Sequence, residues 1–504
     1  MMWNSRVHVK VLAVTLVLLM RGAALAQTPA TTSGTMEYGS GAASSSTAGG
    51  NASSAPGGSA AAALLGPQSP FLGSTPSGKA TAQAIPLSLT DAIHRALRYN
   101  LGLLLSAQSS RMARGQRWEA LSKLLPQVNA SVTETRQEIN LEALGFPANA
   151  FPGFPVIVGP FNTFDARAYL TAPILSLEDL RNERAASEDV QAAQYTYQDA
   201  RQTVVLATGN AYLITNAGEA RVASAQAEVA TAQALYQQAV DRFHTGLSPQ
   251  IDVLRAQVEL QSRKQELIAA KNDYATEKLD LARVIGLPDG QPYELTTKTP
   301  YAPLQGVTLD KVLEDAYRNR PDYKAAIVRV HAAETRRKAV LAERYPSVDF
   351  QSNFGDIGLT PSNSHETFAI AGTVKIPVFQ GGRVHGDLLE ADAQVEQSKE
   401  QLGNLKSQID YDVRTALMNL KTASDQVSVA QSNVKLAAQT LQQARDRFAA
   451  GVTDNIEVVQ AQEAVARADE NYISSLYAHN LAKVALARAA GIAEQAVLQY
   501  LGGK

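Results

Sequence analysis

The chain has 504 residues, a formal net charge of −2 and no cysteine. This charge gives no electrostatic reason to expect nucleic acid as a partner. The missing cysteines exclude disulfides, thiolate metal sites and cysteine nucleophiles. The seven histidines show no metal-ligand spacing, and no phosphate-binding loop occurs. We therefore expect no metal, no cofactor and no catalytic residues.

The N-terminus has the pattern of a secretory signal. A basic start precedes the apolar run 11–20, and Ala24 and Ala26 provide small residues before a cleavage site at Gln27. The run is shorter than the about 20 residues that a spanning helix needs, and no later stretch approaches that length. Residues 1–26 are therefore predicted to be a signal peptide, and the mature protein to be exported without a transmembrane helix.

Residues 27–84 form a low-complexity segment of Ala, Gly, Ser, Thr and Pro with few charges. Such a composition buries too little apolar surface to offset the entropy of ordering. The segment is expected to be a disordered leader, and a tail that binds the cell wall or a partner is the alternative.

The rest of the chain consists of two similar halves, residues 85–300 and 301–504. The sequence DRFHTGLSPQIDVLRAQ at 241–257 returns as DRFAAGVTDNIEVVQAQ at 446–462 without a gap. The same offset aligns LARVIGL, which begins at Leu281, with LARAAGI. Two copies of one long unit indicate a pseudo-symmetric assembly rather than an enzyme with one asymmetric pocket.

Each half is predicted to begin with a helix, over residues 88–123 and 308–344. The segments LSLTDAIHRALRYN and VTLDKVLEDAYRNR carry the similarity between the two helices. Each helix is expected to end before a proline, Pro126 or Pro346, because proline disfavours helical geometry in the residue that precedes it.

Beyond each proline the hydrophobic period changes from 3.6 to 2, which predicts two strands in each half, each with one apolar face. In most soluble proteins such a face covers a core, and the strands taken alone leave that alternative open. An exported, helix-rich chain favours transmembrane strands with lipid on one face. Four strands cannot close a barrel and an open edge cannot lie in lipid, so three chains would supply twelve strands. The residues predicted to face lipid are Val128, Phe164, Val348, Phe368, Ile370, Val374 and Ile376.

Very long helices are predicted over 177–244 and 382–449, followed by return helices over 250–284 and 455–489. Nearly seventy helical residues span on the order of 100 Å. Apolar residues recur along both long helices at the spacing of a coiled-coil seam. A second alanine stripe indicates neighbours on both sides, as in a cylinder of helices, and a rod-like coiled coil with one seam is the alternative. An opening helix stacked end to end on a return helix would match one long helix in length.

Two turns join the long helices to the return helices. Gly246 and Gly451 lie where a long helix ends, a position that favours a left-handed residue. Ser248 and Thr453 follow them and can cap the next helix, as can Asp454.

Asp252 and Glu457 lie in the first turn of the return helices. The helix dipole favours negative charge there. Capping and the dipole explain the polar residues of both turns structurally, and a functional role for them is an additional expectation.

The order helix, strand, strand, long helix, turn, helix thus occurs twice behind an export signal, and each turn carries D-R-F-x-x-G-x-x-x-x-I-[DE]-V. Over about residues 86–500 the chain resembles the TolC family of outer-membrane efflux proteins. The resemblance implies a mainly α-helical fold with a small β part. In that fold three protomers form a twelve-stranded transmembrane β-barrel, continuous with a periplasmic α-helical barrel. The protein would lie in the outer membrane, with most of its mass in the periplasm.

The resemblance also implies the function and the partners. The homotrimer would be a passive exit duct of a tripartite efflux or type I secretion system, fed by a periplasmic adaptor protein and an inner-membrane pump. The acidic side chains of Asp252 and Glu457 would narrow the tunnel entrance. The tip turns that would dock the adaptor are Gly246, Leu247, Ser248, Gly451, Val452 and Thr453.

The sequence departs from relatives of that family in three ways. It has no cysteine that could carry a lipid, its leader is long, and residues 146–161 lengthen the first strand hairpin, where an ordered external loop is expected. A structural or adhesive periplasmic coiled coil without channel activity is the alternative function. A periplasmic adaptor is a third, although it would need β-rich domains that two hairpins do not supply.

Overall fold

The computed structural model describes residues 69–145, 147, 155–298, 301–304, 306–453 and 455–501, all of which belong to one compact unit of the chain. The predicted signal peptide, residues 1–26, and the leader as far as residue 68 lie outside the described residues. Residue 454 and part of the inserted segment 146–161 also lie outside them.

The leader is placed in the structure from Ser69 onward, which corrects the expectation of disorder as far as residue 84. The short 3-10 helix η2 (Pro70–Leu72) follows Ser69, whose hydroxyl accepts a hydrogen bond from the Phe71 nitrogen at 3.4 Å. The Phe71 ring fills the space beside Gly102, where a β-carbon would lie 2.4 Å from it. Because these few apolar side chains find a partner surface elsewhere in the chain, the argument from composition fails for them.

The opening helix of the first half is broken at Asn100, where one continuous helix was predicted. It consists of α3 (Leu89–Tyr99) and α4 (Leu101–Ser122). The amide oxygen of Asn100 caps α4 by accepting a hydrogen bond from the Gly102 nitrogen at 3.0 Å. Its amide nitrogen donates to the Phe71 carbonyl at 2.7 Å. An asparagine used as an N-cap inside the predicted helix therefore divides it.

The opening helix of the second half is broken at the equivalent place, Arg320. It consists of α7 (Leu309–Asn319) and α8 (Pro321–Ala342). Arg320 has φ −58° and ψ 118°, which is not helical, as expected for a residue that precedes a proline. The prediction of a single helix over 308–344 is therefore wrong. The effect of proline on the preceding residue, which correctly predicted the end of the helix before Pro346, also breaks it before Pro321.

Short polar side chains cap the start of α3 and of the first long helix. The Ser88 hydroxyl accepts a hydrogen bond from the Asp91 nitrogen at 3.1 Å, and the Asp91 carboxylate accepts one from the Ser88 nitrogen at 3.4 Å, which is a capping box. The Ser176 hydroxyl accepts a hydrogen bond from the Asp179 nitrogen at 3.2 Å at the start of the long helix. These caps satisfy backbone donors that a helix start leaves unpaired.

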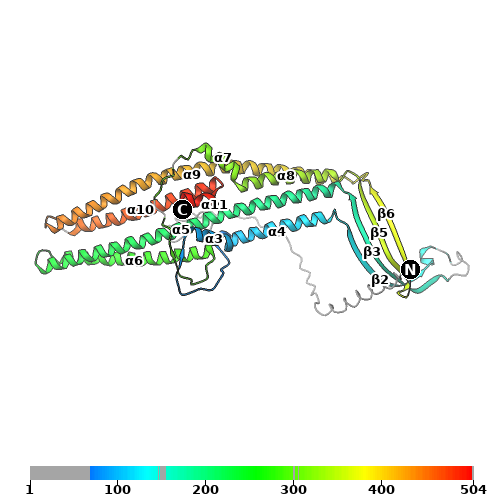
Figure 1. Ribbon diagram of the computed structural model, residues 1–504, viewed down its shortest axis with the longest axis horizontal. Coiled ribbons are helices and arrows are strands. Elements are labelled where there is room, and N and C mark those ends of the chain that lie inside the picture. Colours follow the sequence, from blue (N-terminus) through cyan, green and yellow to red (C-terminus); the bar gives the residue numbers. More distant parts are fainter. Residues whose placement is uncertain are drawn as a thin grey trace, which may run out of the picture. The chain divides into compact units, whose positions relative to one another are not determined.

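Four strands form one antiparallel sheet in the order β2, β3, β5, β6 (Figure 1). The hairpin of each half contributes two strands, and the pairing of β3 with β5 joins the halves. Within the described residues, β2 and β6 have no strand paired to their outer sides, so they are the edges of the sheet. The bounds are β2 Gln127–Asn140, η3 Glu142–Leu144, β3 Ile157–Leu175, β5 Ser347–Thr360 and β6 Asn363–Lys375.

The register gives the sheet one apolar and one polar face. Ala168 lies opposite both Ala130 of β2 and Phe354 of β5, and Phe354 lies opposite Phe368 of β6. Residues directly opposite each other share a face, and side chains alternate along each strand. The predicted alternation is therefore confirmed, and Ile376 follows directly after β6. The face of Phe368 also carries Val128, Phe164, Val348, Ile370 and Val374.

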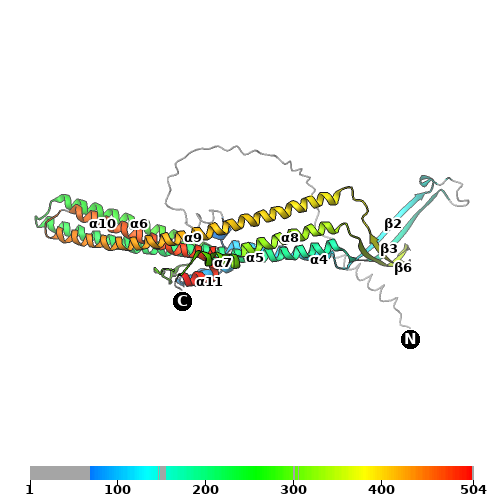
Figure 2. The same cartoon turned by 90° about the horizontal axis from the view of Figure 1, so that it is seen from above.

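The two long helices, α5 (Leu177–His244) and α9 (Arg383–Ala449), lie at the predicted positions. The return helix α6 (Gln250–Ile285) lies along one part of α5 and α4 along the other, and α10 (Asn455–Ala489) and α8 divide α9 in the same way (Figures 1 and 2). The predicted end-to-end arrangement of opening and return helices is confirmed. Helix α5 also packs against α8 and α10, which joins the halves.

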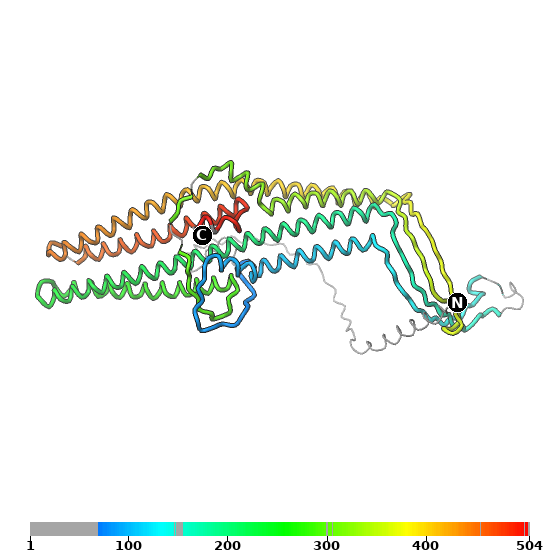
Figure 3. The backbone as a smooth tube through the Cα atoms, in the orientation of Figure 1, coloured from blue at the N-terminus to red at the C-terminus, as the bar shows by residue number. Residues whose placement is uncertain are grey.

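Buried apolar side chains follow the predicted seams of the long helices. Ala232 and Ala239 of α5 and Val427, Leu441 and Phe448 of α9 are all buried. Figure 3 shows the duplication as two hairpins, α5 with α6 in green and α9 with α10 in orange and red. The seams hold each hairpin together by the burial of apolar surface.

Two short strands and a short helix were also not predicted. Strands β1 (Ile85–Leu87) and β4 (Tyr293–Leu295) pair in parallel, and α11 (Ala493–Tyr500) follows α10. The buried Tyr212 of α5 donates a hydrogen bond from its hydroxyl to the Leu87 carbonyl at 3.1 Å. Three-residue strands are too short to show a period, so pattern analysis misses them. Within the part of the chain that the structure describes, no helix is both long and apolar enough to span a membrane.

Candidate functional site

The first turn, between α5 and α6, ends its helix as the glycine predicts. Gly246 has φ 74°, and its nitrogen donates to the Phe243 carbonyl at 3.0 Å. The Leu247 nitrogen donates to the Arg242 carbonyl at 2.8 Å. These two bonds make a Schellman motif, which a residue of left-handed conformation closes. The Leu247 side chain is 69% exposed, so the turn presents an apolar group to solvent.

The second turn, between α9 and α10, repeats this geometry. Gly451 has φ 74°, and its nitrogen donates to the Phe448 carbonyl at 3.1 Å. The Val452 nitrogen donates to the Arg447 carbonyl at 3.0 Å, and the Val452 side chain is 70% exposed. Each predicted tip turn therefore carries one exposed apolar side chain next to a glycine that no β-branched residue could replace without strain.

An arginine that sequence analysis did not single out holds the two turns together. Arg242 Nη1 donates to the Phe448 carbonyl at 2.9 Å, and its guanidinium lies 4.7 Å from the centre of the Phe448 ring. The equivalent arginine of the second half, Arg447, instead binds Glu457 at 3.1 Å. The repeated D-R-F motif marks both positions, but it cannot show that the two copies use their arginines differently.

The predicted cap of the return helix α6 differs from the observed one, and Asp454, a predicted cap of α10, lies outside the described residues. The N-cap of α6 is Pro249, and the Ser248 hydroxyl is buried without a hydrogen-bond partner among the described residues. The prediction that Ser248 caps α6 is therefore wrong, because Ser248 lies one residue too early in the chain. The Thr453 hydroxyl donates to the Glu457 carboxylate and so fixes a first-turn side chain.

Asp252 lies in the contact between α6 and α10, where an entrance position was expected. Its side chain is only 8% exposed and lies 3.7 Å from the Arg255 guanidinium. The Asn455 amide donates to the Asp252 carbonyl at 3.1 Å. In the protomer Asp252 faces helix neighbours, and its place at the entrance of a trimer stays a prediction.

Glu457 is the more accessible of the two predicted entrance carboxylates. Its side chain is 39% exposed, and its two oxygens bind Arg447 and Thr453. The structure therefore does not bring Asp252 and Glu457 together as a pair of free acids. One is a buried helix-contact group, and the other is a half-exposed member of an ion pair.

An apolar groove of about 380 Å³ lies beside the tip turns, between α6 and α10. Arg255, Glu259 and Gln460 add polar groups to its wall. Sequence analysis missed the groove because apolar residues at helical spacing are also the pattern of a buried face. Its apolar lining consists of Ile251, Leu254, Val258, Ile456 and Val459.

In the part of the large sheet nearer the helices, the two faces differ in charge as well as polarity, whereas Glu134, Asp356 and Glu366 lie on the face of Phe368 farther from the helices. Phe368, Ile370 and Val374 are largely exposed on the apolar face. On the polar face Arg167 Nε donates to Asp165 Oδ1 at 2.8 Å. The Lys375 ammonium lies 2.7 Å from the Asp349 carboxylate on the same face. The charged side chains of the polar face are thus held in ion pairs.

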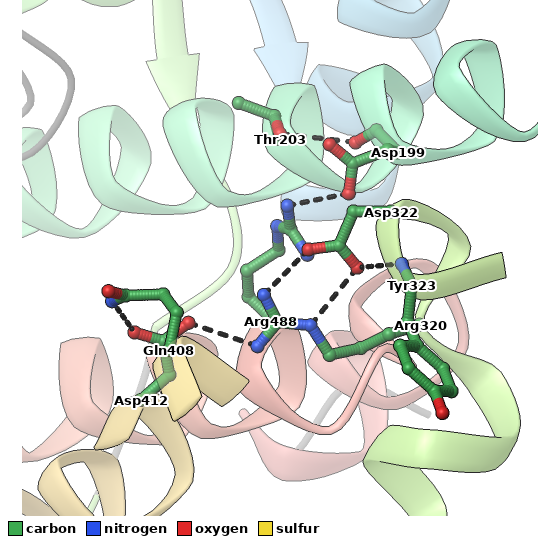
Figure 4. Close-up of polar contacts among 8 residues, drawn as sticks. All are labelled: Asp199, Thr203, Arg320, Asp322, Tyr323, Gln408, Asp412 and Arg488. Atoms are coloured by element: carbon green, nitrogen blue, oxygen red, sulfur yellow. Dashed lines mark hydrogen bonds and ion pairs between the residues drawn. The ribbon is translucent and has the colours of Figure 1, made fainter. Parts of the chain in front are cut away.

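A group of charged side chains joins four helices from both halves (Figure 4). Arg320 binds Asp322 at 2.7 Å and Asp412 of α9 at 3.0 Å, and Arg488 of α10 binds Asp199 of α5 at 2.7 Å. Burial alone would raise the pKa of Asp322, but the hydrogen bonds and charge of Arg320 hold it below its usual value. Burial raises the pKa of Asp199 in spite of Arg488. The cluster fixes how the halves pack where the opening helix of the second half breaks.

The family model for outer membrane efflux proteins matches residues 92–287 and 312–492, one segment in each half. The chain belongs to the outer membrane efflux protein family. The resemblance to the TolC family is thereby confirmed, and the protein is an efflux channel of the outer membrane that extends into the periplasm. Members of this family are passive transporters rather than enzymes.

Two sequence relatives are similar over most of the chain. The toluene efflux pump outer membrane protein TtgF of Pseudomonas putida is 24% identical over 386 residues, which cover 73% of this chain and 76% of that protein. The outer membrane protein TolC of Escherichia coli is 20% identical over 375 residues, which cover 71% and 73%.

Solved structures share the fold of this efflux protein. A membrane protein from Pseudomonas aeruginosa superposes with a TM-score of 0.70 at 19% identity, covering 83% of this chain and 95% of that one. The CmeC outer membrane channel of Campylobacter jejuni superposes with a TM-score of 0.69 at 18% identity, covering 84% and 92%. The duplicated order of helices and strands therefore persists where little sequence identity remains.

Proposed function

We propose that three copies of this chain close one twelve-stranded barrel in the outer membrane and continue it as a helical duct in the periplasm. The observation that carries the proposal is a four-stranded sheet with one apolar face and two unpaired edges. Unpaired backbone groups are costly in lipid, so each edge needs a partner strand. Because the strands alternate in direction, β6 of one copy can continue the antiparallel sheet onto β2 of the next.

The apolar face of the sheet would lie against lipid and the polar face would line the water-filled interior. The shortest of the four strands, β6, has 13 residues, above the about 9–11 that a tilted strand needs to cross the bilayer. Phe368, Ile370 and Val374 would face the acyl chains, as would Val128, Phe164, Val348 and Ile376. The ion pairs Arg167–Asp165 and Lys375–Asp349 would face water.

An exposed apolar stripe on α9 supports contact between copies in the helical part. Its residues are spaced 7, 11 and 7 positions apart, which keeps them within about 20° of one line along a helix. In its own chain α9 packs against α8 and α10, and the four side chains of the stripe stay largely exposed. A neighbouring copy would cover them. The stripe consists of Tyr411, Met418, Val429 and Leu436.

The tip turns would dock a periplasmic adaptor that links the duct to an inner-membrane pump. Leu247 and Val452 are exposed beside a groove lined by branched aliphatic side chains. An amphipathic helix binds such a groove through apolar residues at helical spacing. Energy for transport would come from the pump, and this chain would conduct passively.

Glu457 would occur three times around the axis of the trimer, near the periplasmic entrance. Carboxylates around a narrow, water-filled neck attract cations and hinder anions. The half-exposed side chain of Glu457 supports this role, whereas Asp252 is buried and its contacts support a role in helix packing. Arg447 would moderate the charge of each Glu457.

Conductance in a planar lipid bilayer tests the proposed function. Purified full-length protein should insert as a trimer and give discrete ion-conducting channels. A periplasmic coiled coil without channel activity would give no conductance, and it would be released from the membrane fraction even when no detergent is added. That result would contradict the proposal.

A further inference from the structure

A buried carboxylate of α6 lies in the space left by a glycine of α5. If Gly218 carried a β-carbon, that atom would lie 2.0 Å from Glu277 Oε2 and 3.2 Å from the Tyr274 ring. Glu277 Oε2 is buried and has no hydrogen-bond partner among the described residues. The Glu277 side chain is 16% exposed. An ionised carboxylate is costly in such a place because nothing donates to one of its oxygens.

The cation nearest to Glu277 is already bound to another helix. Arg221 Nη1 lies 3.8 Å from Glu277 Oε1, beyond hydrogen-bond distance. Arg221 Nε lies 3.1 Å from both carboxylate oxygens of Glu470 on α10. Arg221 therefore connects α5 to the return helix of the other half, while Glu277 competes for it from the return helix of its own half.

The other titratable groups around Glu277 are mostly acidic or neutral. They come from α6 and α10. Burial raises the pKa of Glu277 to about 7, the charge of Arg221 opposes this rise, and nearby carboxylates add to it. The titratable groups around Glu277 are Asp273, Tyr274 and Asp280 of α6 and Glu470 and Tyr477 of α10, and Glu219 of α5 and Glu294 of β4 lie around Tyr274.

We propose that proton binding by Glu277 decides which return helix Arg221 holds, so that acidity sets how firmly the two halves of the protomer are joined. When Glu277 is neutral, Arg221 stays with Glu470 and ties α5 to α10. When Glu277 is ionised, the unpaired carboxylate draws Arg221 across the 3.8 Å gap and weakens the tie to Glu470. The inference rests on the proposed function only in placing these helices in the periplasm.

The direction of the effect on stability follows from linkage. The native pKa of Glu277 is raised above its ordinary value of 4.5, so the folded protein binds a proton that the unfolded chain releases. This contribution favours folding below about pH 4.5 and is lost as the pH rises toward the native pKa of about 7. Acid therefore strengthens the contact between halves, and mild alkali weakens it.

A distance measurement in the full-length protein tests the proposal. Because the chain has no cysteine, Gln226→Cys on α5 and Asn471→Cys on α10 give two unique positions for spin labels. Both residues are exposed. Mixing with an excess of unlabelled protein leaves one labelled copy in each assembly. The distance distribution should be narrow at about pH 5.5 and broader or longer at about pH 8.5, with a midpoint near neutrality.

Two variants separate the role of Glu277 from a general effect of pH. Glu277→Gln cannot ionise and should keep the narrow distribution at both pH values. Gly218→Ala fills the space of the carboxylate, which must move toward solvent, so the midpoint should shift to acid by at least about one pH unit. Glu463→Gln, in an exposed pair with Arg467 on α10, is the matched control and should behave as the parent does.

The proposal is overturned if the parent distribution is the same at both pH values. It is also overturned if Glu277→Gln responds to pH as the parent does. Neither readout depends on conductance. A pH-dependent distance in a protein without channel activity would contradict the proposed function and leave this inference standing. A conducting trimer in which the distance between the labels does not change with pH would support the proposed function and overturn this inference.

Discussion

Gly491 lies directly against the backbone of Arg320, so that a β-carbon on Gly491 would be 2.6 Å from the Arg320 nitrogen. In the first half the equivalent glycine is Gly286. A β-carbon added to Gly286 would lie 2.6 Å from the β-carbon of Tyr99. Both glycines have left-handed backbones, with φ 74° and 72°. The duplication has therefore kept one contact twice, in which the glycine after a return helix packs against the break in an opening helix.

Replacing Gly491 by alanine should destabilise the protein by more than backbone strain alone. A left-handed alanine costs about 1–2 kcal/mol, and rotation of a side chain cannot relieve a clash with the Arg320 backbone. Gly290→Ala is the matched control, because Gly290 has φ 78° and nothing within 4 Å of an added β-carbon. Thermal unfolding followed by circular dichroism should give the lower melting temperature for Gly491→Ala, and equal melting temperatures would contradict the contact.

The sequence alone predicted the long-range organisation of the fold because the duplication and the periodicities extend over many residues. The long helices, the return helices and the apolar strand face all lie where they were expected. The break at Arg320 could also have been predicted, since Pro321 follows it. The break at Asn100 gives a weaker signal, because an asparagine inside a helical pattern caps a new helix only when tertiary contacts favour it.

Side-chain surroundings could not be predicted in the same way. The repeat shows that Asp252 and Glu457 are equivalent, but not that one is buried beside Arg255 and the other binds Arg447. The environment of Glu277 depends on a glycine elsewhere in the sequence, on another helix, which no local pattern connects to it. Motifs repeated in sequence therefore located the tip turns without distinguishing the roles of their charged residues.

Arginine on the apolar face of β6 should prevent insertion, and arginine on the polar face should be tolerated. Ile370→Arg near the bilayer midplane should cost about 2–4 kcal/mol, because the charge would enter lipid. Thr373→Arg lies three residues away on the opposite face and is the control. The measurement is the fraction of trimer recovered in the outer membrane. Normal assembly of Ile370→Arg together with failure of Thr373→Arg would mean that the faces are assigned backwards.

An acidic residue at a tip turn should abolish efflux without affecting assembly. Val452→Asp removes an exposed apolar side chain and leaves Gly451, which closes the turn, in place. The trimer should therefore still reach the outer membrane. Drug susceptibility of cells that carry the complete efflux system measures the loss. Leu144→Asp, a change of similar exposure at the strand end of the chain, should leave resistance intact. Resistance of Val452→Asp cells at the parental level would count against adaptor docking at this turn.

Glu457 and Arg447 should change ion selectivity in opposite directions. Glu457→Gln removes a carboxylate from the proposed entrance ring and should lower the preference for cations, or raise conductance, with little change in melting temperature. Arg447→Gln frees the carboxylate of Glu457 and should raise that preference. Asp252→Asn should lower stability and leave selectivity unchanged, because Asp252 is buried. Reversal potentials in planar bilayers measure the ion selectivity of each variant. If Glu457→Gln and Arg447→Gln both keep the parental value, Glu457 is not a functional residue.

Disulfide cross-linking between β2 and β6 tests the three-copy barrel most directly, since the chain has no cysteine of its own. Asn129→Cys in β2 is combined in turn with a cysteine at Ala369, Ala371 or Thr373 of β6, all on the polar face. Within one chain β3 and β5 separate these strands, so a disulfide between them has to join two copies. We predict that at least one combination, after oxidation in the outer membrane, gives a covalent trimer as the largest product. Oxidation that leaves every combination monomeric, or that produces ladders beyond three copies, would contradict the closed three-copy barrel.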